Sequence, residues 1–309
     1  GGEYQGAQKA AYCDPFAAKT GARVIQDGPV SNTKLRVLLE AESDDWNVIV
    51  SDDYMMTGLQ MDGLISEVDT SIVDMTKIAE PFRFAYGASC SVGATLLAFA
   101  PDHFEDGKGP QTWADLFDLE KFPGTRMLSR QPIRNIELAL LADGVAPADL
   151  YPLDVERALK KLDEIKDNII FYESNSQSQQ LISDGAAACG TMYSNRAFGL
   201  VKNGGKVGVS WDGHLRNTTL HIVPKAIQEP DIAWALINET LNAENQAHFA
   251  NLQASAPTNP DALALVDEDV RPWLATHEEN MPKGVQIDPV YWQDQMVANT
   301  ERWQEWMLL

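Results

Sequence analysis

The sequence predicts an α/β protein of two lobes, each a mainly parallel sheet flanked by helices. Its 309 residues are long for one hydrophobic core and comfortable for two. Helical and strand patterns alternate along the chain, and several strands are short apolar runs typical of sheets that are buried on both faces. Hydrophobic residues make up 44% and charged residues 22%, a balance typical of a packed globular protein. Two lobes imply a cleft between them, where we expect a ligand to bind.

In the predicted first lobe, helical and strand patterns follow one another. Apolar residues at helical spacing mark the helices, two of which end near Gly21 and Gly63. A linker to the second lobe is expected to begin near Pro101. The predicted helices are residues 4–19, 32–41 and 55–62, and the predicted strands are 22–25, 46–50, 82–89 and 95–99, with an edge segment at 64–69.

In the predicted second lobe, caps and turns frame the same alternation. Thr112 caps a short helix, and Gly144 stops a helix that begins at Asn135. Residues 154–167 carry their apolar side chains on one stripe. The predicted helices are residues 113–117, 135–143, 154–167, 176–183 and 196–202, and the predicted strands are 126–128, 169–172, 190–193 and 207–209.

The last part of the chain is expected to return to the first lobe through residues 220–224 and then to be mainly helical. Helices are predicted at residues 232–241, from about 245, and at 289–307. In the last helix Trp292, Trp303 and Trp306 share one face, which is typical of packing against a core. The predicted domains are residues 1–100 with 224–285 as lobe 1, residues 101–223 as lobe 2, and residues 286–309 as a C-terminal helix that packs on the lobes.

The charge and the apolar runs exclude two classes of partner. A net charge of −21 repels phosphate backbones, and the basic residues form no stripe, so we expect no nucleic acid. The simplest interpretation of the excess of acidic residues is a strongly hydrated protein surface. No run approaches the roughly 20 apolar residues that span a bilayer, so we expect no membrane insertion. The abrupt start at Gly1 without a signal peptide suggests a processed or trimmed N-terminus.

The motifs that an enzyme, a metal site or a cofactor site would need are missing. The chain has no GxSxG, GxGxxG, GxxxxGK[ST] or HExxH, and its five histidines are scattered, so we expect no metal and no cofactor. Asp52 and Asp53 form a possible acid–base pair, but adjacent carboxylates after a strand more often cap a helix or hold a ligand. Among Cys13, Cys90 and Cys189 one disulfide is possible.

Polar residues gather where predicted strands meet helices. Ligands of α/β sheets bind beyond the carboxyl ends of strands, where loops and helix starts converge. We therefore expect the ligand-binding residues at these joints. They are Tyr4, Asp52, Asp53, Ser89, Ser91, Arg130, Arg134, Asn135, Ser176, Gln177, Tyr193, Asn195 and Arg196.

Three arginines at these joints are candidates for a carboxylate clamp. Backbone N–H groups at helix starts meet anions, and a guanidinium adds a bidentate contact with a carboxylate. Arg130, Arg134 and Arg196 lie at such joints. For each arginine taken alone, a surface or ion-pair role is the alternative.

Six segments carry a resemblance to a known family. They are residues 112–124, 138–145, 158–165, 180–185, 256–260 and 301–306. In these segments the chain resembles the extracellular solute-binding proteins of the spermidine/putrescine type, which serve ABC importers. The resemblance spans nearly the whole chain in the family's order.

The resemblance implies a type II-like periplasmic-binding-protein fold with the ligand cleft between the lobes. It also implies a periplasmic location and delivery of a small molecule to an ABC permease in the inner membrane. Family members usually have a strand before a Gly-Gly like Gly1 and Gly2, so the chain looks as if it starts one strand late and Tyr4 would face the cleft. We expect a monomer whose lobes close about a hinge on the ligand.

The chain departs from the polyamine-binding pattern in two segments. Such relatives commonly have a tryptophan before the Asn of the segment like 193–195, and an aromatic and an acid shortly before the Pro224-like position. The second segment here contains Asn217 and Thr219 instead, which we include among the ligand-binding residues. A diammonium ligand needs charge pairing or an aromatic face, so this departure disfavours a polyamine.

The preferred ligand is a small carboxylate or an amino acid-like zwitterion, with Asp52 or Asp53 meeting the ammonium group. A polyamine such as putrescine or spermidine is the alternative. An enzyme on the same two-lobed fold is less favoured, and a structural or signalling protein without a ligand is a third class.

Overall fold

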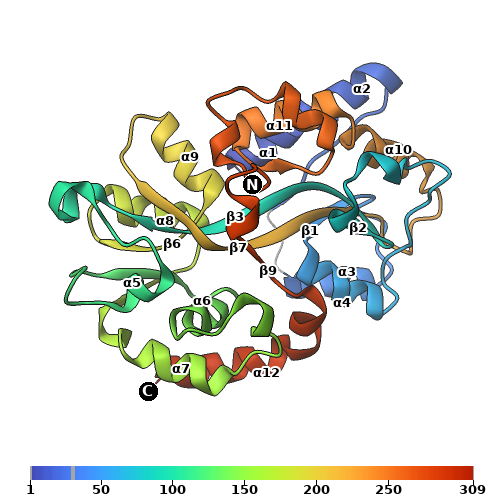
Figure 1. Cartoon of the computed structure of the whole chain (residues 1–309). Helices are drawn as coiled ribbons and strands as arrows, with labels where there is room; N and C mark the ends of the chain where they lie inside the picture. The colour runs from blue at the N-terminus through green and yellow to red at the C-terminus, as the bar shows by residue number, and fades with distance from the viewer. Residues whose placement is uncertain (1, 29–31, 309) are drawn as a thin grey trace. The chain divides into compact units, whose positions relative to one another are not determined.

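The computed structural model describes residues 2–28 and 32–308, which fall into two compact units (Figure 1). Unit 1 contains the chain up to Gly93 and Asn217–His277, and unit 2 contains Ala94–Arg216 and the chain from Glu278 onward. The chain passes between the units three times. The expected bounds, 1–100 with 224–285 and 101–223, lie several residues away because the first two passages fall inside long strands, where no turn signal marks a boundary.

Unit 1 is built from helices on antiparallel strands. Its helices are α1 (Gly2–Gln8), a π-helical turn (Lys9–Cys13), α2 (Asp14–Thr20), α3 (Asn32–Glu40), α4 (Asp53–Met61), α10 (Asp231–Thr240) and α11 (Ala243–Gln253). Its strands are β1 (Ile49–Asp52), β2 (Arg83–Phe84), β8 (Ala256–Pro257), the first half of β3 (Gly87–Phe99) and the second half of β7 (Gly208–Ile222). Short 3₁₀ turns cover Met75–Lys77, Glu80–Phe82, Pro260–Leu265 and Arg271–Trp273.

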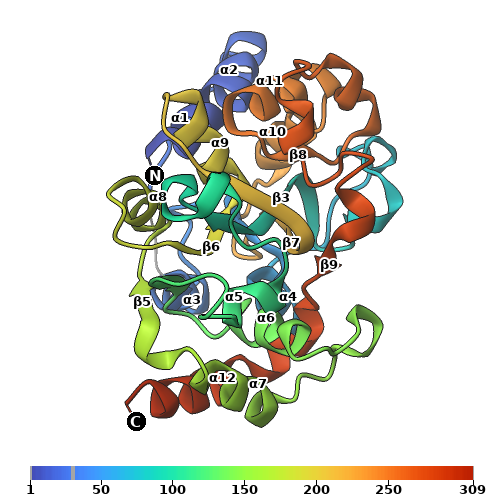
Figure 2. The same ribbon diagram turned by 60° about the vertical axis from the view of Figure 1, so that its left-hand side comes forward.

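The strand pairings of unit 1 correct one expectation. β1 pairs antiparallel with β7, and β3 pairs antiparallel with β2 and β8, so a mainly parallel sheet is the wrong description of this unit. Helices α3 and α4 cover β1 and β7 through a core that includes Leu35, Met56 and Ile222. A second core holds Tyr12 of the π-helical turn against Phe249 of α11, and α1 lies beside α11 (Figure 2).

Unit 2 has the parallel pairing that the sequence predicts. Its helices are α5 (Trp113–Phe117), α6 (Asn135–Ala142), α7 (Val155–Asp163), α8 (Asn175–Ser183), α9 (Ser194–Lys202) and α12 (Pro289–Leu308). Its strands are β4 (Arg126–Ser129), β5 (Ile169–Tyr172), β6 (Cys189–Tyr193), β9 (Val285–Gln286) and the remaining halves of β3 and β7. Short 3₁₀ turns cover Pro101–His103, Glu105–Gly107, Pro147–Asp149, Lys166–Asn168 and Met281–Lys283.

Strand β4 is central to unit 2, with β5 and β6 parallel on either side of it. β6 pairs antiparallel with β3, and β9 pairs parallel with β7. The sheet order β1-β7-β3-β6-β4-β5 is therefore mixed.

The C-terminal helix α12 belongs to unit 2, where it lies beside α7 (Figures 1 and 2). Trp292, Trp303 and Trp306 are buried, which confirms their packing role. Trp303 Nε1 donates a hydrogen bond to the backbone oxygen of Arg130, and Trp306 Nε1 donates to the carboxylate of Asp163. The helix is therefore fixed by polar contacts as well as by apolar burial.

Three strand predictions were wrong. Residues 22–25 form no strand, and Ile25 is 72% exposed. The runs 82–89 and 95–99 were expected as separate strands, but 87–99 is continuous, because its small polar residues are buried within the sheet. The runs 207–209 and 220–224 mark the two ends of β7, which continues through Gly213 at a φ of 63°.

The three cysteines are free thiols, so the disulfide left open by the sequence is not formed. Among residues 2–28 and 32–308, no helix is both long and apolar enough to span a membrane.

Candidate ligand-binding site

Five predicted residues of unit 1 come together around the end of β1 and the stretch of β7 beside it. Asp52 ends β1 opposite Thr219 of β7, and the Nδ2 atom of Asn217 donates a 2.8 Å hydrogen bond to the Asp52 carboxylate. The phenol of Tyr4, on α1, lies near the side chains of Ser91 and Thr219, both of which act on its pKa. We call Tyr4, Asp52, Ser91, Asn217 and Thr219 the unit 1 cluster.

The unit 1 cluster combines one carboxylate with neutral hydroxyl groups. Burial, the neighbouring Cys90 and the charge of Asp52 raise the pKa of Tyr4 well above its ordinary value. Burial also raises the pKa of Cys90 to about 12. The phenol and the thiol therefore stay neutral at physiological pH, and Asp52 supplies the negative charge.

Asn217 places a further hydrogen-bond acceptor beside the charged carboxylate of Asp52. Its side chain is 2% exposed, and because Nδ2 faces Asp52, its Oδ1 atom is left buried without a hydrogen-bond partner among the described residues. Buried polar atoms of this kind are rare in folded proteins. A carboxylate, an amide oxygen and hydroxyl oxygens together suit a ligand group that has several N–H donors.

Two other predicted residues of unit 1 support the sheet instead. Asp53 is fully buried, and its Oδ2 atom accepts a 3.1 Å hydrogen bond from the backbone N–H of Thr218. Ser89 is fully buried, and its hydroxyl donates to the backbone oxygen of Phe82 at 2.6 Å. We therefore leave Asp53 and Ser89 out of the proposed site.

Unit 2 brings an arginine onto a tyrosine at its strand ends. Arg134 precedes α6 and is 8% exposed, and its guanidinium carbon lies 4.9 Å from the ring centre of Tyr193, which ends β6. The charge of Arg134 also acts on Tyr172, which ends β5 and whose phenol lies 3.0 Å from the hydroxyl of Thr191. The ring of Tyr193 thus faces the guanidinium, and Tyr172 is near enough to feel its charge.

Buried polar atoms without a hydrogen-bond partner in the described part of the chain occur on residues close in sequence to Arg134 and to Tyr193. Asn135 is fully buried, and its Nδ2 atom donates to the backbone oxygens of Ser129 and Gln131. Within residues 2–28 and 32–308, Asn135 Oδ1, Asn195 Oδ1 and Arg196 Nε are buried and lack hydrogen-bond partners. Asn195 and Arg196 are the second and third residues of α9, whose N-cap is Tyr193. We call Arg134, Asn135, Tyr193, Asn195 and Arg196 the unit 2 cluster.

The remaining predicted residues of unit 2 are exposed. The side chain of Arg130 is 56% exposed and lies 3.8 Å from Glu173, so Arg130 has the surface ion-pair role that the sequence left as an alternative. Gln177 accepts a hydrogen bond from the backbone of Glu173, and Ser176 lies on the surface of α8. We do not include these three residues in the proposed site.

Sequence reasoning missed Glu137 and Tyr172. Glu137 is fully buried in α6, and its carboxylate accepts a hydrogen bond from the backbone N–H of Arg134. The sequence carried only half of a capping-box signal here, because Glu137 stands three residues after Arg134 and not after a serine or threonine. Tyr172 ends a predicted strand, which is where the other candidates were sought.

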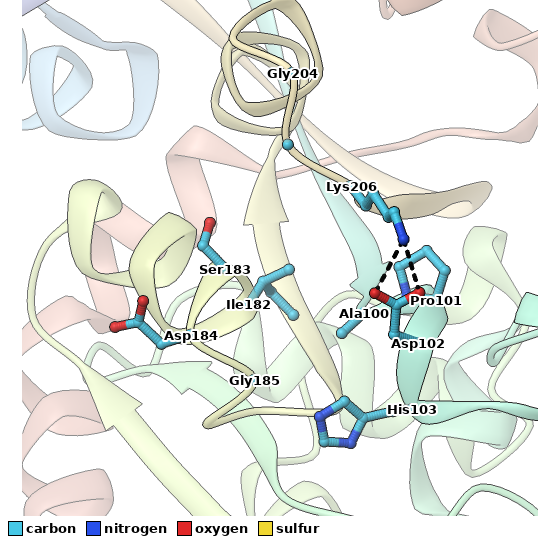
Figure 3. Close-up of a pocket in the computed structure, with 11 residues that line it drawn as sticks. Ala100, Pro101, Asp102, His103, Ile182, Ser183, Asp184, Gly185, Gly204 and Lys206 are labelled. Carbon is cyan, nitrogen blue, oxygen red and sulfur yellow. Dashed lines mark hydrogen bonds and ion pairs between the residues drawn. The ribbon is translucent and has the colours of Figure 1, made fainter.

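A cavity of about 500 Å³ lies elsewhere in unit 2 (Figure 3). Its lining includes Asp102, His103, Ile182 and Lys206, and Lys206 Nζ contacts both carboxylate oxygens of Asp102 at 3.1 and 3.2 Å. None of the predicted ligand-binding residues lines it. Its cation is already paired, so we do not place a ligand there. In the described ranges 2–28 and 32–308, no group of three or more His, Cys, Asp or Glu side chains is placed to hold a metal ion.

The chain forms two α/β units, passes between them three times, and carries one polar cluster in each unit. This arrangement is typical of the class of solute-binding proteins. The chain belongs to the family of bacterial extracellular solute-binding proteins, whose model matches residues 11–280.

Known relatives agree with this class. The chain is 28% identical to a gamma-aminobutyric acid-binding protein of Pseudomonas aeruginosa, over 99% of this chain and 88% of the relative. It is 22% identical to spermidine/putrescine-binding periplasmic protein 1 of Haemophilus influenzae, over 94% and 79%. A solved structure described as the Atu4243-GABA receptor has a TM-score of 0.92 and 35% identity, over 99% of this chain and 95% of that one.

These findings confirm the predicted two-lobed α/β fold class, apart from the mainly parallel sheet expected in unit 1, and they confirm the resemblance and the function class. The chain is the substrate-binding component of an ABC transporter, which binds a small solute for a permease and is not an enzyme.

Proposed function

We propose that the solute is a small zwitterion of the γ-aminobutyrate kind, with an ammonium group at one end and a carboxylate at the other. The observation that carries the proposal is the opposite charge of the two clusters. Unit 1 offers the Asp52 carboxylate with oxygen acceptors, and unit 2 offers the guanidinium groups of Arg134 and Arg196.

The unit 1 cluster would bind the ammonium group. A primary ammonium has three N–H donors and no acceptor. The Asp52 carboxylate, Asn217 Oδ1 and the hydroxyl of Thr219 or Tyr4 provide acceptors for all three. Because Asn217 Nδ2 holds Asp52, the carboxylate is oriented before the ligand arrives.

The unit 2 cluster would bind the carboxylate. A guanidinium pairs with a carboxylate through two parallel hydrogen bonds, and burial strengthens this attraction by excluding water. The position of Arg134 over Tyr193 limits its rotamers. Asn135 and the start of α9 add polar groups beside it.

The names of two relatives support this ligand class. The Pseudomonas aeruginosa protein is a gamma-aminobutyric acid-binding protein, and the solved structure is described as a GABA receptor. The Haemophilus influenzae relative makes a polyamine the alternative. The two arginines argue against a polyamine. The second ammonium group of a diamine would lie near Arg134 and Arg196, and like charges at short range repel.

The location and the mode of action belong to the same proposal. We infer a periplasmic monomer that changes the relative placement of its units when it binds the solute and then delivers it to a permease in the inner membrane. The extracellular family assignment supports this location.

Calorimetric titration with γ-aminobutyrate, glutamate and putrescine tests the ligand class. We expect γ-aminobutyrate to bind, and we expect Asp52→Asn and Arg134→Ala each to weaken binding by about 10- to 1,000-fold, because each leaves a buried charge of the ligand unpaired. Arg130→Ala is the matched control and should change the affinity by less than about twofold, since Arg130 is an exposed ion-pair residue.

Binding of putrescine with no binding of γ-aminobutyrate or glutamate would sink the proposed ligand class. Equal losses in Arg130→Ala and Arg134→Ala would contradict the assignment of the clamp.

A further inference from the structure

The backbone at Arg134 has a conformation that arginine rarely adopts. Its φ is 76° and its ψ is −36°, in the region that favours glycine. A glycine there would remove the strain but also the guanidinium. Strained residues of this kind persist only where their surroundings hold them, and they cluster at functional sites.

The carboxylate of Glu137 holds this conformation. Its Oε2 atom accepts a 2.7 Å hydrogen bond from the backbone N–H of Arg134, one turn earlier in the chain. Its Oε1 atom accepts hydrogen bonds from the phenol of Tyr151, at 2.9 Å, and from the indole of Trp292. Each carboxylate oxygen is therefore bound, and Trp292 brings α12 into the arrangement.

Because Glu137 is buried, its use as a helix cap costs free energy of desolvation. Its side chain is fully buried, and burial raises its pKa above the ordinary value despite these hydrogen bonds. An exposed serine or aspartate before the helix would cap it at lower cost. The use of a buried glutamate next to a strained arginine indicates that the direction of the arginine side chain matters.

We propose that Glu137 is a positioning residue for ligand binding. By bonding the N–H of Arg134, it fixes the backbone conformation that directs the guanidinium over the ring of Tyr193. Trp292 and Tyr151 in turn orient the carboxylate. The inference rests on the proposed function, in which Arg134 binds the carboxylate of the solute.

Glu137→Gln and Trp292→Phe separate positioning from general stability. The amide oxygen of the new glutamine satisfies Tyr151 and Trp292 together, which leaves its NH₂ group against the N–H of Arg134. Trp292→Phe removes one donor at Oε1 and keeps the bond at Oε2. Both variants should lower the melting temperature, because both disturb a buried hydrogen bond.

The first readout needs no ligand. In a crystal structure of the Glu137→Gln variant we expect Arg134 to leave its positive φ and its guanidinium to leave the ring of Tyr193, whereas the Trp292→Phe variant should retain both. An unchanged Arg134 in Glu137→Gln would overturn the inference.

The second readout is the affinity for γ-aminobutyrate in a double-mutant cycle with Arg134→Ala. We expect Glu137→Gln to weaken binding about tenfold in the parent chain, as for the loss of one charge-assisted hydrogen bond, and less than about twofold in the Arg134→Ala background. Trp292→Phe should change the affinity by less than about threefold.

The cycle distinguishes the two proposals. If Arg134→Ala leaves the affinity unchanged, the proposed clamp is wrong. If Arg134→Ala weakens binding but Glu137→Gln does not, or if Glu137→Gln weakens it equally in both backgrounds, the clamp stands and the positioning role is overturned.

Discussion

Single buried residues of this protein carry properties that depend on pH. His221 of β7 is 4% exposed, its ring meets that of Tyr12 edge-on at 6.0 Å, and Nδ1 lies 3.4 Å from the hydroxyl of Thr240. Burial lowers its pKa to about 4. His221 is therefore neutral in the folded protein at a pH where the unfolded chain already binds a proton.

We predict that acidification destabilises the protein through this residue. Between pH 6.5 and about 4 the unfolded state binds the proton and the folded state does not, so the free energy of unfolding falls as the pH falls. At pH 4.5 the loss amounts to ~2 to 3 kcal/mol relative to pH 7.

Urea denaturation of the parent chain and of His221→Asn at pH 7 and pH 4.5 checks this prediction. The difference between the two pH values should be smaller in His221→Asn by ~2 to 3 kcal/mol. The same substitution at exposed His248 is the control. Identical differences in the parent chain and in His221→Asn would contradict the prediction.

The residues of the site could be predicted from sequence only up to their placement at strand ends. Asp52 and Arg134 became candidates because carboxylates and arginines after strands suit ligand binding, and they remain candidates in the proposed site. The roles of Arg130 and Ser89 could not be separated from theirs, because exposure and the direction of a side chain depend on distant segments. The contact of Asn217 with Asp52, for example, joins residues 165 positions apart.

At the scale of helices and strands, the parallel pairing of β6 with β4 depends on one glycine. Gly190 has a φ of 152° and lies opposite Met127, and a Cβ atom there would fall 1.9 Å from the carbonyl oxygen of Met127. In contrast, a Cβ atom on Gly199 of α9 would have Gln179 Nε2, at 3.6 Å, as its nearest neighbour.

We predict opposite effects of the same substitution at these two positions. Gly190→Ala should lower the free energy of unfolding by at least ~3 kcal/mol, because the backbone of β4 or β6 must move. Gly199→Ala should leave it unchanged or raise it by up to ~1 kcal/mol, because alanine favours helix. Urea denaturation measures both, and equal stabilities would show that the sheet yields at Gly190 without cost.

Helices were easier to predict than strands because their ends carry local signals. Thr112 caps α5 as predicted and accepts a hydrogen bond from the N–H of Asp115, and Gly144 follows the end of α6 with a φ of 85°. Long strands carry no such signals along their length. β3 and β7 contain small and polar residues that look like breaks in the sequence, yet these residues are paired and largely buried within the sheet.

At the scale of the whole molecule, two of the three chain passages lie within β3 and β7. Gly93 and Asn217 are the last and first residues of unit 1 at these passages, and a Cβ atom on Gly93 would lie 3.4 Å from Asn217 Oδ1. A residue of the unit 1 cluster therefore sits where the chain passes from one unit to the other.

We predict that saturating γ-aminobutyrate decreases the radius of gyration of the parent chain. The physical reason is that a ligand which is bound by both clusters favours the arrangement in which both can reach it. Small-angle scattering with and without ligand measures this change, and Arg134→Ala at the same ligand concentration is the control. Superimposable profiles for ligand-bound and ligand-free parent chain would contradict closure.

The contact between Trp292 and Glu137 has a consequence for the inheritance of specificity. Residues 94–216 are one continuous segment, and a recombination event could transfer them from one relative to another as a block. Such a transfer would bring Arg134 and Glu137 but leave behind Trp292, which lies beyond the third passage on α12. The buried carboxylate of Glu137 thus takes one of its hydrogen bonds from a tryptophan that is encoded elsewhere. We expect a block placed in a relative without this tryptophan to lose melting temperature more than affinity, as Trp292→Phe should, because Glu137 loses one buried hydrogen bond there.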